Sequence, residues 1–500
     1  MDNNLSKQMA TESQFEPNSS GFRLKKITLD NVLNLIAILV LLILGLRAIS
    51  TVDTSWDSLA YHLPFAGRLV GILRPEELLL SLRIEQYYLG FPLLAEFLQG
   101  LMWFLTGRLA STNLASLFCL VILIIVTVRR LKLEFWKVSL VLLSVPLIQI
   151  HSVLSYIDLI GGCLITISLV NLLSSIENNN FSLKEFVYCA LPLALAANVK
   201  YNLTILALPG LFLVIIFFFF KNNKRSDNRL RGRRWAFLFG LLSVLFVIIS
   251  TWYMVRNTIL FANPVYPLGV SVGNVEVEAG EYSPYKYSLV NTLAPKKLLR
   301  YLYSISELGL WTQKGTSVWS VDMSNGISNP ADEPFFKLGG FFIGNLILWF
   351  IVLIIATKET KAKLLSRLLI AVIIMFIGIG FMPSSDYLRY WMFLPMILGI
   401  TMLFFMRKAG WMGRSIGAMV LLLQFAIFVN VAYQNRTYFK PLPLSSEQEL
   451  INQYDLPEGS TGLCVTDLPP RGILFERANP DLAIQSINPM DSCIYPVYQN

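Results

Sequence analysis

A short polar stretch, Trp56 to Pro64, directly follows the first long apolar segment of the chain. Asp57 and Tyr61 lie four residues apart in it, so they share one face if the stretch is helical. A carboxylate close to the hydrocarbon of a bilayer is costly, and one that is kept there often has a function. Asp57 is therefore the first candidate catalytic residue, as a general base or as a metal ligand.

Further ionisable residues fall where apolar segments end on the same side as Asp57. His62 follows Tyr61, His151 ends one apolar segment, and Asp158 begins the next. The other candidates on this side are Glu85, Lys200, Tyr201, Arg256, Asn257, Arg389 and Tyr390. Carboxylates and cations around one rim suit chemistry on a phosphate-bearing substrate, since a carboxylate can accept a proton or hold a metal ion while cations hold the phosphate.

These residues also have simpler explanations. Asp57 could cap a helix, and Lys200 could extend its side chain to the interface. His62 and His151 could be interfacial hydrogen-bonding residues, and Arg389 could anchor a helix at the headgroups. The sequence has no P-loop, Rossmann glycine motif, paired CxxC or HExxH, so it does not support a nucleotide-driven reaction.

Composition excludes a soluble protein of this size. The 500 residues are 55% hydrophobic and 15% charged, and the apolar residues form blocks long enough to cross a bilayer. Such blocks must be helices, because the backbone in lipid has to satisfy its own hydrogen bonds. The net charge of +9 lies in short loops between the blocks, which indicates membrane orientation and contact with membrane lipids, not nucleic-acid binding.

We therefore predict an all-α polytopic membrane protein with about eleven transmembrane helices. The predicted spans are about 32–50, 112–128, 137–151, 157–175, 186–200, 202–220, 235–255, 339–357, 366–383, 388–406 and 413–433. With these spans every basic cluster falls on one face, which is then cytoplasmic. The N-terminus is expected inside and the C-terminus outside.

This topology divides the chain into three parts. Residues 1–31 are a disordered cytoplasmic leader, residues 32–433 the transmembrane domain, and residues 434–500 an extracytoplasmic tail. The transmembrane domain has two long outer loops, at 51–111 and 256–338.

The first outer loop contains an apolar segment at 86–106 that we expect to be an interfacial or re-entrant helix. If it crossed the membrane, every later basic cluster would move to the other face. In an extracytoplasmic tail Cys464 and Cys493 could form a disulfide, with two free thiols as the alternative.

Several short motifs occur in a distinctive order along the chain. They are WDSLAYHLP at 56–64, YLGFPL at 88–93, SYID at 155–158, KYN at 200–202, WYMVRN at 252–257 with NPVYP at 263–267, and DYLRY at 386–390. Together with a first helix that begins in the cytoplasm and a long first outer loop, this order resembles the GT-C superfamily of polytopic glycosyltransferases. That superfamily includes the protein O-mannosyltransferases and the bacterial aminoarabinose transferases of lipid A.

The resemblance implies a transferase of the bacterial inner membrane. Such an enzyme moves a sugar from a polyprenyl-phosphate donor to a lipid, glycan or protein acceptor on the extracytoplasmic face. Asp57 would be the general base, and Asp158 would orient the acceptor or a metal ion. Lys200, Arg256 and Arg389 would stabilise the departing lipid phosphate.

The motifs define no cofactor, and Asp57 and Asp158 are the candidate ligands of a divalent cation, Mg²⁺ or Mn²⁺. Ser58 stands where a second acidic residue would complete a pair with Asp57, which argues against a metal site in the first loop.

Other membrane functions compete with this interpretation. An O-antigen ligase or polymerase would place arginine and histidine in a late outer loop, and the loop at 256–338 has arginine but no histidine. A transporter or flippase of lipid-linked sugars would carry polar residues near the bilayer midplane, often within repeats. Here the ionisable residues lie at the rim. A structural subunit without a site is the third alternative.

Overall fold

The fold is taken from a computed structural model of the chain. It describes residues 28–75, 78–223, 229–268 and 343–454 apart from short gaps, together with shorter pieces within 270–305 and 463–498. The predicted leader lies almost wholly outside the described residues. The first helix begins at Leu29, where the Thr28 hydroxyl accepts a hydrogen bond from the backbone of Asn31.

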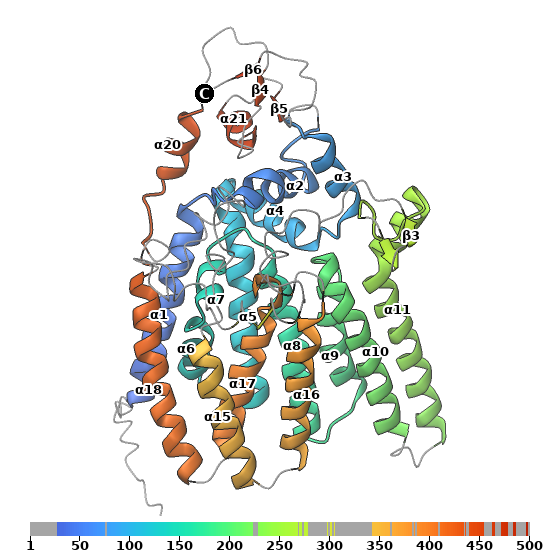
Figure 1. Ribbon diagram of the computed structural model, residues 1–500, viewed down its shortest axis with the longest axis vertical. Coiled ribbons are helices and arrows are strands. Elements are labelled where there is room, and N and C mark those ends of the chain that lie inside the picture. Colours follow the sequence, from blue (N-terminus) through green and yellow to red (C-terminus); the bar gives the residue numbers. More distant parts are fainter. Residues whose placement is uncertain are drawn as a thin grey trace, which may run out of the picture.

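The chain folds into a bundle of apolar helices, as expected for a polytopic membrane protein (Figure 1). Five helices in the described part are long and apolar enough to cross a membrane. They are α1 (Leu29–Ser50), α5 (Leu114–Leu131) with the preceding 3₁₀ turn η2 (Leu109–Asn113), α8 (Asp158–Glu177), α10 (Tyr201–Asn223) and α11 (Arg229–Phe261).

The remaining predicted spans also coincide with helices, although the number of eleven crossings stays a prediction. These helices are α6 (Phe135–Leu143), α7 (Pro146–His151), α9 (Leu183–Ala196), α15 (Ile343–Thr360), α16 (Lys363–Gly380), α17 (Phe393–Lys408) and α18 (Trp411–Gln434). α6 and α7 divide one predicted span, because Pro146 begins a new helix. α17 is buried on all sides from Phe393 to Met406, so it forms the centre of the bundle.

The two ends of the bundle differ in what they carry. The first loop and the tail lie at one end, which we call the site end (Figure 1). The opposite end, which we call the basic end, carries the start of α1, the α5–α6 turn, the end of α17 and the start of α18. Described cations at the basic end include Arg129, Arg130, Lys132, Lys137, Arg407, Lys408 and Arg414.

The first loop forms short helices across the site end. These are the π-helical turn η1 (Ser58–His62), α2 (Leu63–Leu69), α3 (Leu82–Gly90) and α4 (Leu94–Thr106). α3 and α4 meet at 100°, so the apolar segment at 86–106 is not one straight span. Figure 1 shows α4 lying across the end of the bundle, in keeping with an interfacial or re-entrant segment.

The tail is connected to the first loop through a small parallel sheet, which the sequence analysis did not foresee. The tail contributes α20 (Ser446–Asn452), α21 (Gly472–Ala478), β4 (Leu463–Val465), β5 (Ile484–Ser486) and β6 (Val497–Tyr498). The strand order is β1-β5-β4-β6, and β1 (Leu78–Leu79) comes from the first loop. A salt bridge of 3.1 Å from Arg108 to Glu447 adds a second connection.

The second outer loop is described only in part. Its strands β2 (Val270–Val272) and β3 (Val275–Glu278) form an antiparallel hairpin. Tyr301 is buried, and its ring lies 6.3 Å from that of Phe376 in α16. Cys493 lies outside the described residues, so the predicted pairing with Cys464 stays a prediction.

Close packing of α2 on α4 positions the polar stretch that contains Asp57. A Cβ atom at Gly100 of α4 would lie 2.3 Å from the backbone oxygen of Ala66 in α2. Such a distance is far below van der Waals contact, so only glycine allows this crossing.

We predict that Gly100→Ala destabilises the protein by about 1–3 kcal/mol, because the two helix backbones would have to separate. The measurement is the apparent Tm of the purified protein. Gly240→Ala in α11 is the matched control, since a Cβ atom at that position would have nothing within 4 Å. An equal loss of Tm in both variants would contradict the packing argument.

Candidate functional site

Asp57 and Arg389 form an ion pair at the site end, although 332 residues separate them. Asp57 immediately precedes η1, and Arg389 lies in the 3₁₀ turn η4 (Leu388–Trp391) just before α17. Arg389 Nη2 donates to Asp57 Oδ2 over 2.8 Å, and the two side chains are 10% and 15% exposed. The pair is thus largely desolvated, while part of Asp57 stays accessible.

Asp158 and Lys200 form a second pair next to the first. Asp158 is the first residue of α8, Lys200 immediately precedes α10, and Nζ lies 2.8 Å from Asp158 Oδ1. The other Asp158 oxygen is 4.0 Å from Arg389 Nε. Arg389 therefore lies between two carboxylates. We call Asp57, Asp158, Lys200 and Arg389 the charge cluster.

Aromatic rings line the cluster on the side of its cations. The Arg389 guanidinium lies 4.7 Å from the centre of the Tyr156 ring. Lys200 Nζ lies 3.9 Å from the centre of the Tyr390 ring, so both cations gain cation–π contacts. Burial and then the negative charge of Asp57 raise the pKa of Tyr61 well above its ordinary value. The Tyr61 hydroxyl therefore stays protonated.

Two polar atoms of the cluster have no hydrogen-bond partner among the described protein atoms. They are Asp158 Oδ2 and Arg389 Nε, which are both buried. Buried polar atoms nearly always have a partner. A bound polar ligand or an ordered water could donate to the Asp158 oxygen and accept from the Arg389 nitrogen.

The two histidines lie near the cluster, each close to the Tyr156 ring that contacts Arg389. His62 Nδ1 is 2.8 Å from Oε1 of Glu96, and both side chains are buried. The His151 ring centre is 5.2 Å from that of Tyr156, and neither of its nitrogens has a described protein partner. Glu96 lies in α4, within the segment 86–106 that we expected to be interfacial or re-entrant, and its carboxylate orients His62.

Three further candidates have structural contacts away from the charge cluster. Glu85 pairs with Arg68 over 2.7 Å. Asn257 donates to the backbone oxygen of Gly90 over 2.7 Å, and Arg256 contacts that of Phe91 over 3.4 Å. None of these described contacts reaches the cluster.

The last predicted residue, Tyr201, lies in the same region. Its ring centre is 5.5 Å from that of Phe91. Tyr201, Arg256 and Asn257 thus contact the end of α3 and the residue that follows it.

Asp53 supports the candidate site, and sequence reasoning missed it. It is buried, and its carboxylate accepts hydrogen bonds from Ser58 Oγ over 2.6 Å and from the backbone of Ser155 over 2.8 Å. These bonds connect the Asp57 stretch to the segment before Asp158. The available signal was an acidic residue directly after an apolar segment, the criterion that selected Asp57.

The residues of the cluster do not fit a divalent cation well. Asp57 and Asp158, the expected ligands, are each paired with a cation. In the described part of the chain no three His, Cys, Asp or Glu side chains are grouped as metal ligands. A metal ion would have to displace Arg389 or Lys200, because a dication beside two cations is strongly repelled.

Fold and site together define a polytopic α-helical membrane protein with a buried acid–cation cluster at one end. The chain is similar to ArnT from Cupriavidus metallidurans, with a TM-score of 0.40 and 13% identity to the apo crystal structure. The similarity to its crystal structure with bound undecaprenyl phosphate has a TM-score of 0.41 and 12% identity. Each covers 92% of this chain and 86% of the other.

No protein-family model matches the chain, and no curated protein matches it.

We predict that Lys200→Met lowers stability by about 3–5 kcal/mol, because it leaves the buried Asp158 carboxylate without its nearest cation. The double variant Asp158→Asn/Lys200→Met is expected to lose less than the sum of the single losses. Apparent Tm values of the four proteins form the double-mutant cycle. Strictly additive losses would show that the pair is not coupled.

We also predict that Mn²⁺ at millimolar concentration produces no saturable rise in apparent Tm. A ligand that binds the folded state raises Tm, and the paired carboxylates leave no site for a dication. Asp57→Asn/Asp158→Asn is the control. A rise in the wild type that this variant abolishes would contradict the prediction.

Proposed function

We propose that this protein is a glycosyltransferase that moves a sugar from a polyprenyl-phosphate donor to an acceptor on the extracytoplasmic face of the membrane. The observation that carries the proposal is the charge cluster, in which a partly accessible carboxylate lies beside two cations. The order of motifs that resembles GT-C enzymes supports it, since several of those motifs contribute to the cluster.

Asp57 is the general base in this proposal. The acceptor hydroxyl attacks the anomeric carbon, its oxygen forms the new glycosidic bond, and the carbon–oxygen bond to the lipid phosphate breaks. The hydroxyl proton passes to Asp57. Only Oδ2 is bonded to Arg389, and part of the side chain is exposed, so the carboxylate can meet an acceptor.

Arg389 and Lys200 stabilise the negative charge that develops on the departing phosphate. Arg389 keeps an unpaired Nε, and Lys200 has three ammonium protons for one described carboxylate partner. Preformed cations in a largely dry site stabilise charge without much reorganisation. Asp158 positions both cations and is too buried to act as the base.

The competing membrane functions receive less support from the described residues. A transport path would need polar groups within the bundle, and a buried set there consists of Ser144, Asn345 and Gln424. These uncharged residues bond one another, with Ser144 to Gln424 at 2.7 Å and Gln424 to Asn345 at 2.6 Å. A closed network of this kind has a structural role.

We predict that Asp57→Asn reduces sugar transfer by about 10²–10⁴-fold, because an amide cannot take the acceptor proton. Mass spectrometry of lipids and surface glycans, from cells with and without the gene, first identifies the missing sugar. The same measurement on cells that carry the variant then tests the role of Asp57.

The matched control is Glu177→Gln, which removes a carboxylate from the ion pairs with Arg407 and Lys408 at the basic end. It should leave transfer at the wild-type level. Wild-type transfer by a folded and inserted Asp57→Asn protein would exclude the assigned role.

A further inference from the structure

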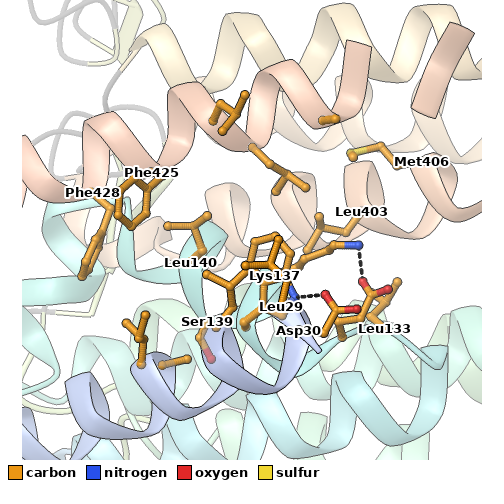
Figure 2. A pocket seen from close by; sticks show the side chains of 18 of the residues that line it. Leu29, Asp30, Leu133, Lys137, Ser139, Leu140, Leu403, Met406, Phe425 and Phe428 are labelled. Atoms are coloured by element: carbon orange, nitrogen blue, oxygen red, sulfur yellow. Dashed lines mark hydrogen bonds and ion pairs between the residues drawn. The ribbon is translucent and has the colours of Figure 1, made fainter. Parts of the chain in front are cut away.

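An apolar cavity of about 840 Å³ lies at the basic end, between α1, α6, α17 and α18. Figure 2 shows Leu140, Leu403 and Phe425 among the side chains that line it, from three different helices. Asp30 and Lys137 lie near one end of the cavity, whereas Phe425 and Phe428 lie toward the other (Figure 2). The cavity is therefore amphipathic along its length.

Its polar end contains both paired and unpaired charges. Lys137 is 2.5 Å from Glu134, and Asp30 accepts a hydrogen bond from Trp136. Lys132 and Arg414 also line the cavity, and neither side chain makes an ion pair or hydrogen bond with another described residue. This end thus has two cations without an ion pair, Lys132 and Arg414, against one such carboxylate, that of Asp30, which is bonded only to the neutral indole of Trp136.

A second, polar cavity of about 390 Å³ adjoins the first. Its lining residues are Arg130, Lys132, Glu177, Asn178 and Arg407. Two cations, Lys132 and Arg407, line both cavities. Arg407 is paired with Glu177 over 2.7 Å, whereas Lys132 has no ion pair with a described residue. An apolar space and a polar space thus meet at an unpaired cation, as an amphiphile with an anionic head requires.

This region is separate from the charge cluster. The cavity contacts α1 between Leu29 and Val40, whereas Asp57 follows the other end of α1 at Ser50. At 1.5 Å per residue, Leu29 and Ser50 are roughly 30 Å apart. A ligand at the basic end is therefore distinct from the substrates of the proposed reaction.

We propose that the two cavities bind one anionic phospholipid of the leaflet at the basic end. Its acyl chains occupy the apolar cavity, and its phosphate lies where the two cavities meet, against Lys132, with Arg414 as the second unpaired cation at this end. Apolar walls from four membrane helices fit hydrocarbon chains, and basic pockets between such helices bind anionic headgroups. The unpaired cations select an anionic lipid over a zwitterionic one.

The test compares lipid retention by native mass spectrometry. The full-length purified protein is incubated with equal amounts of phosphatidylglycerol and phosphatidylcholine. The wild type is expected to retain phosphatidylglycerol preferentially. Lys132→Ala and Arg414→Ala should each reduce that preference about fivefold, which corresponds to about 1 kcal/mol for one cation near an anionic headgroup.

Arg129→Ala is the charge-matched control, because Arg129 is exposed near the same end of α5 and lines neither cavity. Ala37→Trp fills the apolar cavity and should reduce retention of both lipids. Leu46→Trp on the exposed face of α1 should not.

Unchanged preference in the Lys132→Ala/Arg414→Ala double variant would overturn the proposal. An equal loss in Arg129→Ala would also overturn it, since general basic charge would then explain the preference. Sugar transfer does not enter this measurement, so the outcome is independent of the proposed function.

Discussion

The arrangement of the site end depends on Arg389, which lies between two carboxylates. Its guanidinium bonds Asp57 over 2.8 Å and lies 4.0 Å from Asp158, and its side chain is only 10% exposed. A buried cation is stable only if opposite charges compensate its desolvation. Asp57 and Asp158 supply that compensation, one from the first loop and the other from α8. The first loop, α8 and α17 are therefore held together by one electrostatic constraint.

Several other contacts keep the first loop where this constraint needs it. Asp53 connects the polar stretch that contains Asp57 to the segment before α8. Gly100 lets α4 cross closely over α2. The tail extends the support, because its strand β5 pairs with β1 of the first loop. The charge cluster has only four residues, and the surrounding contacts at the site end limit their movement. That limitation is what a preorganised site requires.

Much of the fold could be predicted from the sequence, since long apolar blocks leave the backbone no alternative to helices. The pairing inside the site could not. Asp57 and Arg389 are 332 residues apart, and no local pattern indicates that η1 and η4 meet. Glu96 and His62 are 34 residues apart, and no local pattern indicates that their buried side chains bond. The sequence also predicted Arg256 and Asn257 as site residues. In the structure they contact the backbone of Phe91 and Gly90, away from the charge cluster.

The pairing also explains how a neutral cluster can serve a reaction that produces a charged phosphate. Two carboxylates and two cations leave no net formal charge in the resting site. In the proposed reaction Asp57 loses its negative charge when it takes the acceptor proton, so its attraction for Arg389 falls. The guanidinium then becomes available at the step in which the lipid phosphate gains charge. The base and the cation thus act in sequence because they are paired, and Asp158 keeps Arg389 in place during the exchange.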